Sequence, residues 1–108
     1  MQSDPIRGNT IQWTFDDGPT AGKKFEHVFS DDGTVAYKMA GSDKLTREKH
    51  YECAAITDHV YSVSYLASSG WTLTAILDFD SGGVVAYASN DKQLVVQHGH
   101  FDATRKPS

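Results

Sequence analysis

Apolar and polar residues alternate along most of the chain, which is typical of a β-strand with one buried face. The clearest run is residues 60–67 (VYSVSYLA), where Tyr61, Val63 and Tyr65 alternate with serines. A few small residues separate this run from a second one, residues 70–80 (GWTLTAILDFD). Two β-rich runs joined by a short turn predict a β-hairpin. Because the pattern recurs, we expect an all-β, antiparallel domain.

The chain divides into eight such runs, separated by turn residues such as Asp-Gly and Gly-Gly pairs. The predicted strands cover residues 9–16, 23–30, 34–40, 50–57, 60–67, 70–80, 84–89 and 92–102. Residues 41–48 are predicted to be a polar loop, since their few apolar side chains give a helix little to bury. The strands form a single domain, residues 9–102, between a flexible leader (1–8) and a frayed tail (103–108).

Short connections make neighbouring strands pair with one another, which gives an up-and-down meander. A meander of this size with one apolar face closes into a barrel, and closure removes the exposed edges. The sequence therefore predicts an eight-stranded antiparallel up-and-down barrel. The alternative is a two-sheet sandwich built from the same strands. A barrel of eight strands is wide enough for packed side chains or for one small ligand.

Alternation turns an aromatic face toward the barrel interior, because residues two apart share a face of a strand. The residues expected to line the interior and to contact a ligand are Trp13, Phe15, Phe25, His27, Tyr37, Tyr65, Trp71 and Leu73. Aromatic residues are usually simply core. Here, however, the hydroxyl and imidazole groups of inward-facing tyrosines and His27 need hydrogen-bond partners. Small side chains also leave room, at Ala54, Ala55, Ala75, Ala86 and Ala88. Alternation does not settle which faces of residues 50–57 and 92–102 point inward.

Composition excludes several classes of function. The chain has 108 residues and a net charge of −4, which argues against a nucleic-acid or anionic-membrane surface. No apolar run approaches the roughly 20 residues that span a bilayer, and the first residues lack the features of a signal peptide. The single cysteine, Cys53, fits a reducing cytosol and is best interpreted as a small buried hydrophobe. We therefore expect a cytoplasmic protein.

The histidines offer two candidate sites, a metal site at His98 and His100 and an acid–base residue at His27. His98 and His100 share a strand face and could chelate a metal with a third ligand such as His27, His50 or Glu52. Two histidines at this spacing are more often surface residues, so no metal and no other cofactor is expected. His27, if it points inward, could have its tautomer held by a tyrosine hydroxyl and act as general acid or base. A hydrogen-bonded core histidine is the commoner outcome.

Several segments resemble small bacterial proteins of the MoaF-like group. They are residues 13–22 (WTFDDGPTAG), 25–29 (FEHVF), 32–35 (DGTV), 63–74 (VSYLASSGWTLT) and 88–92 (ASNDK), of which 63–74 is the most specific. The group is named after a protein linked to molybdenum cofactor biosynthesis. The resemblance covers nearly the whole chain and implies a calycin-like or lipocalin-like barrel. It implies little about activity.

The chain is also remotely similar to phenolic acid decarboxylases, which are small barrels of the same type. Their first strand carries Tyr-x-Tyr, where this chain has Trp13-Thr14-Phe15. Their glutamate corresponds to about Ala67 here, and their arginine would fall near Lys44 or Arg47. A shared barrel therefore does not imply the decarboxylation reaction.

The expected function is binding of a small apolar or aromatic ligand inside the barrel, with His27 as the main polar contact. The alternative is a metal-independent lyase or isomerase acting on a small unsaturated or phenolic metabolite. In that enzyme His27 is the acid or base, and Tyr37 or Tyr65 is the orienting donor. A purely structural domain would need an exposed apolar patch, and a homodimer is left open.

Overall fold

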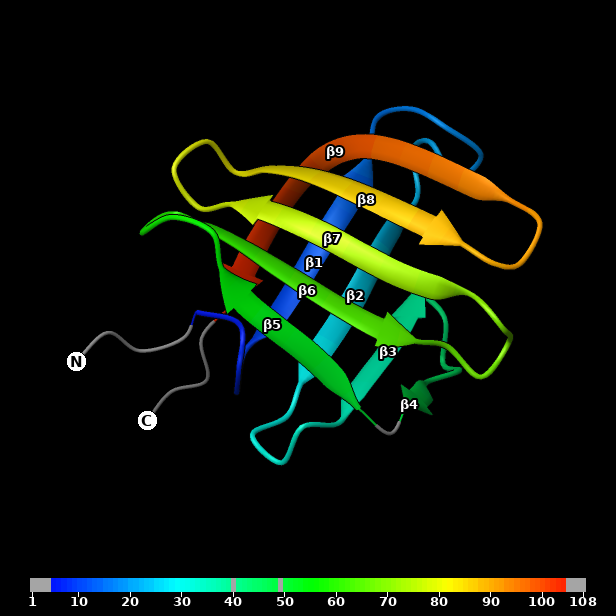
Figure 1. Ribbon diagram of the computed structural model, residues 1–108, viewed down its shortest axis with the longest axis horizontal. Helices are drawn as coiled ribbons and strands as arrows, with labels where there is room; N and C mark the ends of the chain where they lie inside the picture. The colour runs from blue at the N-terminus through cyan, green and yellow to red at the C-terminus, as the bar shows by residue number, and fades with distance from the viewer. Residues whose placement is uncertain (1–4, 40, 49, 105–108) are drawn as a thin grey trace.

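The computed structural model describes residues 5–39, 41–48 and 50–104, and within them nine antiparallel strands form one sheet that curls into a nearly closed barrel (Figure 1). The strands are β1 (Thr10–Phe15), β2 (Lys24–Phe29), β3 (Val35–Met39), β4 (Thr46–Glu48), β5 (Tyr51–Ala55), β6 (Val60–Leu66), β7 (Thr72–Asp78), β8 (Gly83–Ser89) and β9 (Leu94–Thr104). Their order in the sheet is β4-β3-β2-β1-β9-β8-β7-β6-β5. The predicted all-β antiparallel barrel is confirmed. Among the described residues no helix has the length and apolarity that a membrane crossing requires.

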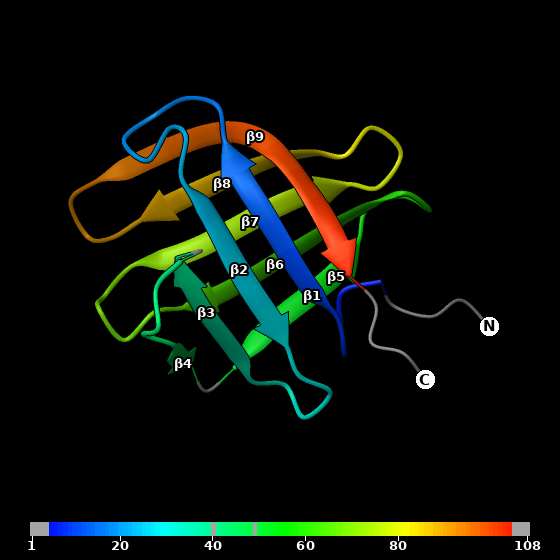
Figure 2. The ribbon, with the colours of Figure 1, turned by 180° about the vertical axis from the view of Figure 1, so that it is seen from behind.

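The two walls of the barrel face one another across its interior. Strands β5 to β8 form the wall nearer the viewer in Figure 1, and β1 to β3 form the wall behind them. Figure 2 shows the same arrangement from the opposite side. Strand β9 curves from one wall to the other, because it pairs with β8 through residues 94–100 and with β1 through residues 99–104.

The prediction for residues 41–48 was wrong in one respect, since the expected loop contains the short strand β4. It pairs with β3, with Val35 opposite Glu48. Alternation could not reveal β4, because the residue that it buries is a carboxylate. As a result β3 does not pair with β5, and β4 and β5 are the two edges of the sheet. One backbone hydrogen bond of 3.0 Å, from Tyr51 N to the Gly33 carbonyl, reaches across the gap near these edges.

One end of the barrel interior is packed with large apolar side chains. Those with no exposed surface at all are Ile6, Ile11, Phe29, Val35 and Leu77. Ile6 belongs to the stretch that was expected to be a leader, and Gly8 N donates a hydrogen bond of 2.7 Å to the Phe29 carbonyl nearby. Toward the other end, β7 and β8 turn alanines inward, so the interior is filled at one end and spacious at the other.

The bend of β9 depends on a close approach at Gly99, which pairs with Phe15 on one side and Val84 on the other. A Cβ atom placed on Gly99 would overlap the Thr14 carbonyl oxygen and lie 2.9 Å from Phe15 Cα. Both are backbone atoms, which cannot move aside without disturbing β1. The sequence therefore needs glycine here to let β9 pass so close to β1.

We predict that Gly99→Ala lowers the free energy of unfolding by about 2 kcal/mol, the usual effect of forcing extra volume into a packed site. Urea denaturation followed by circular dichroism measures the change. Gly83→Ala is the matched control, because its new Cβ would lie 3.2 Å from the Ser81 hydroxyl, a side-chain atom that needs only a small shift to make room. Equal stability of Gly99→Ala and wild type would show that β9 does not need this close approach.

Candidate functional site

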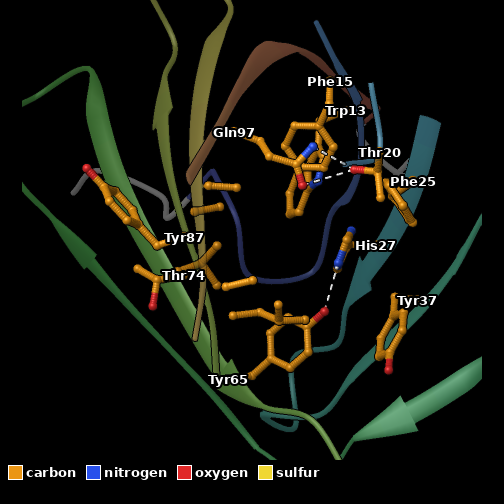
Figure 3. Close-up of a pocket in the computed structure, with 15 residues that line it drawn as sticks. Trp13, Phe15, Thr20, Phe25, His27, Tyr37, Tyr65, Thr74, Tyr87 and Gln97 are labelled. Atoms are coloured by element: carbon orange, nitrogen blue, oxygen red, sulfur yellow. Dashed lines mark hydrogen bonds between the residues drawn. The ribbon is translucent and has the colours of Figure 1, made fainter. Parts of the chain in front are cut away.

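The spacious end of the barrel contains a cavity of about 220 Å³ that is partly open to solvent (Figure 3). Its lining comes from both walls and from the loop after β1, and consists of Trp13, Phe15, Thr20, Phe25, His27, Tyr37, Val63, Tyr65, Leu73, Thr74, Ala75, Ala86, Tyr87, Ala88 and Gln97. The side chain of Tyr87 points away from the others in Figure 3 and is partly exposed on the outer surface. The cavity is therefore bounded by inward-facing side chains of seven strands, with β4 and β5 outside its lining.

The cavity exists because the two walls carry side chains of different size. On β7 and β8, Ala75 lies opposite Ala86 and Leu73 lies opposite Ala88 in the sheet register. The facing wall carries aromatic rings on β1, β2 and β3. Since three alanines occupy positions where larger apolar residues would meet those rings, a void is left between the walls.

Seven of the eight residues predicted to contact a ligand line this cavity. They are Trp13, Phe15, Phe25, His27, Tyr37, Tyr65 and Leu73. The eighth, Trp71, is in the turn before β7 and packs against the apolar core. Their contact with a ligand stays a prediction.

An aromatic stack surrounds His27. The imidazole lies 4.0 Å from the Trp13 ring, centroid to centroid, at an interplanar angle of 23°. The Tyr37 ring lies 5.7 Å from it, also at 23°. Because Trp13 and Tyr37 belong to the strands on either side of β2, the imidazole is held between its two neighbours. The three rings form one aromatic wall of the cavity.

A hydrogen bond joins this stack to the opposite wall. His27 Nε2 lies 2.9 Å from the Tyr65 hydroxyl on β6. The imidazole is 4% exposed, and burial lowers the pKa of His27 to about 3, so the ring is neutral at pH 7. Burial, and then the nearby Tyr37 and Glu48, raise the pKa of Tyr65, which keeps its proton. The pair is thus a contact between two neutral groups.

The other ring nitrogen of His27, Nδ1, is buried and finds no hydrogen-bond partner among the residues that the structure describes. Leaving a buried polar group without a partner costs roughly 1–3 kcal/mol. In Figure 3 this nitrogen lies at the end of the ring away from Tyr65 and faces the part of the view that holds Phe25 and Thr20.

A buried carboxylate supports Tyr37 from behind. The Tyr37 hydroxyl donates a hydrogen bond of 3.3 Å to Glu48 Oε2, and Ser68 donates to the same oxygen through its backbone N–H at 3.0 Å and its hydroxyl at 3.3 Å. Glu48 is only 5% exposed. Burial and then the adjacent carboxylate raise the pKa of Tyr37. The sequence offered no signal for this role, because Glu48 stands alone in a polar stretch.

A second polar group closes the cavity near the loop after β1. The Gln97 side-chain amide donates to the Asp17 carbonyl at 2.8 Å and to the Thr20 hydroxyl at 2.7 Å. Thr20 in turn donates to Gln97 Oε1 at 3.0 Å. Both N–H groups of the amide are therefore used within the protein. Sequence reasoning missed Gln97 because the inward face of its strand was undecided.

The candidate metal ligands are not brought together. His98 and His100 are largely exposed, and their Nδ1 atoms lie 3.0 Å and 3.4 Å from the carboxylates of Asp17 and Asp16. His50 faces Glu52 on the surface, and His27 lies inside the barrel. Within the described parts of the chain, no three His, Cys, Asp or Glu side chains form a group that could hold a metal ion.

Comparison with known proteins identifies a family and a fold. Residues 1–93 match a family model described as the MoaF N-terminal domain. No curated protein matches the sequence. A crystal structure from Burkholderia vietnamiensis, described as that of a candidate beta-lactamase, superposes with a TM-score of 0.76 over 96% of this chain and 100% of its own, at 15% identity. At that identity the likeness shows the fold alone.

The buried imidazole makes a testable contribution to stability at acid pH. In the unfolded chain His27 takes up a proton near pH 6.5, whereas the folded protein resists protonation down to about pH 3. The contribution of the neutral imidazole to the free energy of unfolding is therefore fully present above pH 6.5 and is lost as pH falls. We predict that the free energy of unfolding falls between pH 7 and pH 5 by about 2 kcal/mol more in wild type than in His27→Phe.

Urea unfolding at several pH values in this range measures the difference. The control is His59→Gln, which removes an exposed imidazole and should retain the wild-type loss. If wild type and His27→Phe lose stability in parallel, His27 is not the group that resists protonation.

Proposed function

The chain belongs to the MoaF N-terminal domain family, and we propose that it binds a small, flat, largely apolar molecule inside its barrel. The observation that carries the proposal is the division of the interior. One end is packed with large apolar side chains, while the other contains a cavity of about 220 Å³ between an aromatic wall and an alanine wall. A core selected for stability alone has few voids larger than a water molecule. We also propose that the barrel is of the calycin or lipocalin type, a class of small barrels that can hold one small ligand.

The size of the cavity limits the ligand. An engineered apolar cavity of about 150 Å³ in another protein binds benzene. A volume of about 220 Å³ therefore suits one aromatic or unsaturated ring with a small substituent. The rings of Trp13, His27 and Tyr37 form the aromatic wall that such a ring would meet, and the alanines opposite leave room for it.

The chemistry of the walls supports an uncharged ligand. Most polar groups at the cavity already have a partner within the protein, such as Gln97 with Thr20 and His27 Nε2 with Tyr65. Most of the surface that a ligand would meet is apolar, so burial of its own apolar surface would supply the affinity, at about 25 cal/mol per Å².

The lyase or isomerase reaction receives less support from the same geometry. A general acid or base works best when its pKa is near the working pH. Burial lowers the pKa of His27 to about 3, so the imidazole is a weak base at pH 7 and lacks the second proton that an imidazolium would give as an acid. Binding without turnover is therefore the function that we favour. A cytoplasmic location is part of the proposal, supported by the single cysteine.

We predict that Ala86→Leu weakens the binding of isopropylbenzene, a single-ring hydrocarbon probe, at least tenfold. The larger side chain would occupy part of the cavity while remaining in apolar surroundings, so the melting temperature should not fall. Titrations followed by ¹⁵N–¹H correlation spectra measure the affinity, which for wild type we expect on the order of 1 mM or tighter.

The matched control is Ala55→Leu on β5, which should bind like wild type. It adds the same atoms at a position that was expected among the interior alanines but that is exposed. The proposal fails if wild type shows no saturable binding of single-ring probes, or if Ala86→Leu binds them as wild type does.

A further inference from the structure

We infer that the cavity selects ligands that carry a hydrogen-bond acceptor, and that the N–H group at His27 Nδ1 is the donor that recognises it. The inference rests on the proposed function and adds the chemical class of the ligand: a small planar molecule with one uncharged acceptor, such as the carbonyl oxygen of an aryl ketone or aldehyde.

The first step is the position of the proton on the imidazole. Nε2 and the Tyr65 hydroxyl are 2.9 Å apart, and either could be the donor. If Nε2–H donated to Tyr65, the tyrosine proton would lack an acceptor among the hydrogen bonds of the described residues, and Nδ1 would lack a donor. If Tyr65 donates to Nε2, a single group remains unpaired, the proton on Nδ1. Because each unpaired buried group is unfavourable, the second arrangement holds.

The second step is the charge of the ring. A doubly protonated imidazole would carry a proton on both nitrogens whatever Tyr65 does. Burial keeps His27 neutral, with a pKa of about 3, so the ring carries one proton. Since the Tyr65 hydroxyl occupies the lone pair of Nε2, that proton is on Nδ1. The hydrogen bond across the barrel thus sets the tautomer of the residue in the cavity wall.

The third step is the number of unpaired groups. Over the described residues, His27 Nδ1 is the buried side-chain nitrogen or oxygen that lacks a partner. The amide protons of Gln97 are both used, by Asp17 and Thr20. A ligand that complements this cavity therefore carries one hydrogen-bond acceptor, which meets His27 Nδ1, and is apolar elsewhere.

The fourth step is the charge of the acceptor. The described residues that line the cavity include no Lys or Arg side chain. A carboxylate placed there would lose its hydration with one neutral N–H in exchange, which is strongly unfavourable. A neutral carbonyl gives up far less hydration and satisfies the same donor.

Two probes of nearly the same shape test the inference. Acetophenone and isopropylbenzene differ in a carbonyl oxygen that replaces a methyl group. Acetophenone is the better hydrated of the two, so a cavity without a donor binds isopropylbenzene more tightly. We predict that wild type binds acetophenone at least threefold more tightly than isopropylbenzene, that His27→Phe reverses this preference, and that benzoate binds at least tenfold more weakly than acetophenone at pH 7.

The outcomes separate the two proposals. If both neutral probes bind wild type and the hydrocarbon binds more tightly, the inference is overturned while the binding function stands. A tighter complex with benzoate overturns the neutral class of acceptor. If neither neutral probe binds, the proposed function fails and the inference fails with it.

A measurement without ligand covers the case in which His27→Phe does not fold. Long-range ¹⁵N–¹H correlation spectra of the wild-type imidazole report which nitrogen carries the proton. A proton on Nδ1 supports the inference. A proton on Nε2 overturns it whatever the probes do.

Discussion

The hydrogen bond between His27 and Tyr65 depends on the curl of the whole sheet. Five strand-to-strand steps separate β2 from β6 in the sheet order, and their side chains meet because the sheet turns through a nearly closed barrel. The glycine that lets β9 pass close to β1 is one condition of that curl. The packed end, with Ile11, Phe29 and Leu77, is another, because it fixes the distance between the walls. The cavity is a consequence of this closure, and so is the hydrogen bond by which Tyr65 sets the tautomer of His27 beside it.

Closure near the sheet edges relies on side chains as well as on backbone pairing. Strands β4 and β5 do not pair, and Glu48 links β4 to the turn after β6 through two hydrogen bonds from Ser68. The same carboxylate oxygen accepts the Tyr37 hydroxyl. Glu48 therefore both holds the edge strand β4 in place and positions the Tyr37 ring in the cavity wall. A carboxylate suits this place, since its oxygen can accept several hydrogen bonds at once where a ladder of backbone pairs is interrupted.

The sequence was informative where the inward residues are large and apolar. Strands β1, β2 and β6 were found by alternation, which placed Trp13, His27 and Tyr65 on the inner face because the residues two positions away on either side are apolar. Alternation failed at β4 because Glu48 is a buried polar residue. It left β9 undecided because Gln97 and Gly99 are not apolar. Trp71 lies in the turn before β7 because that strand begins two residues later than predicted. In each case a tertiary contact, not local preference, decides the structure.

Membership of a family and a shared barrel do not by themselves specify a ligand, since the same fold carries unrelated functions. The chemistry must come from the residues inside. A leucine at position 27 would fill the same place and would bury no polar group. It would also remove the loss of stability that the buried imidazole causes in acid. Departures from the most stable core are expected where a protein binds something. The imidazole is such a departure, and its position beside an indole ring and a void supports the proposed role in recognition over a role in packing alone.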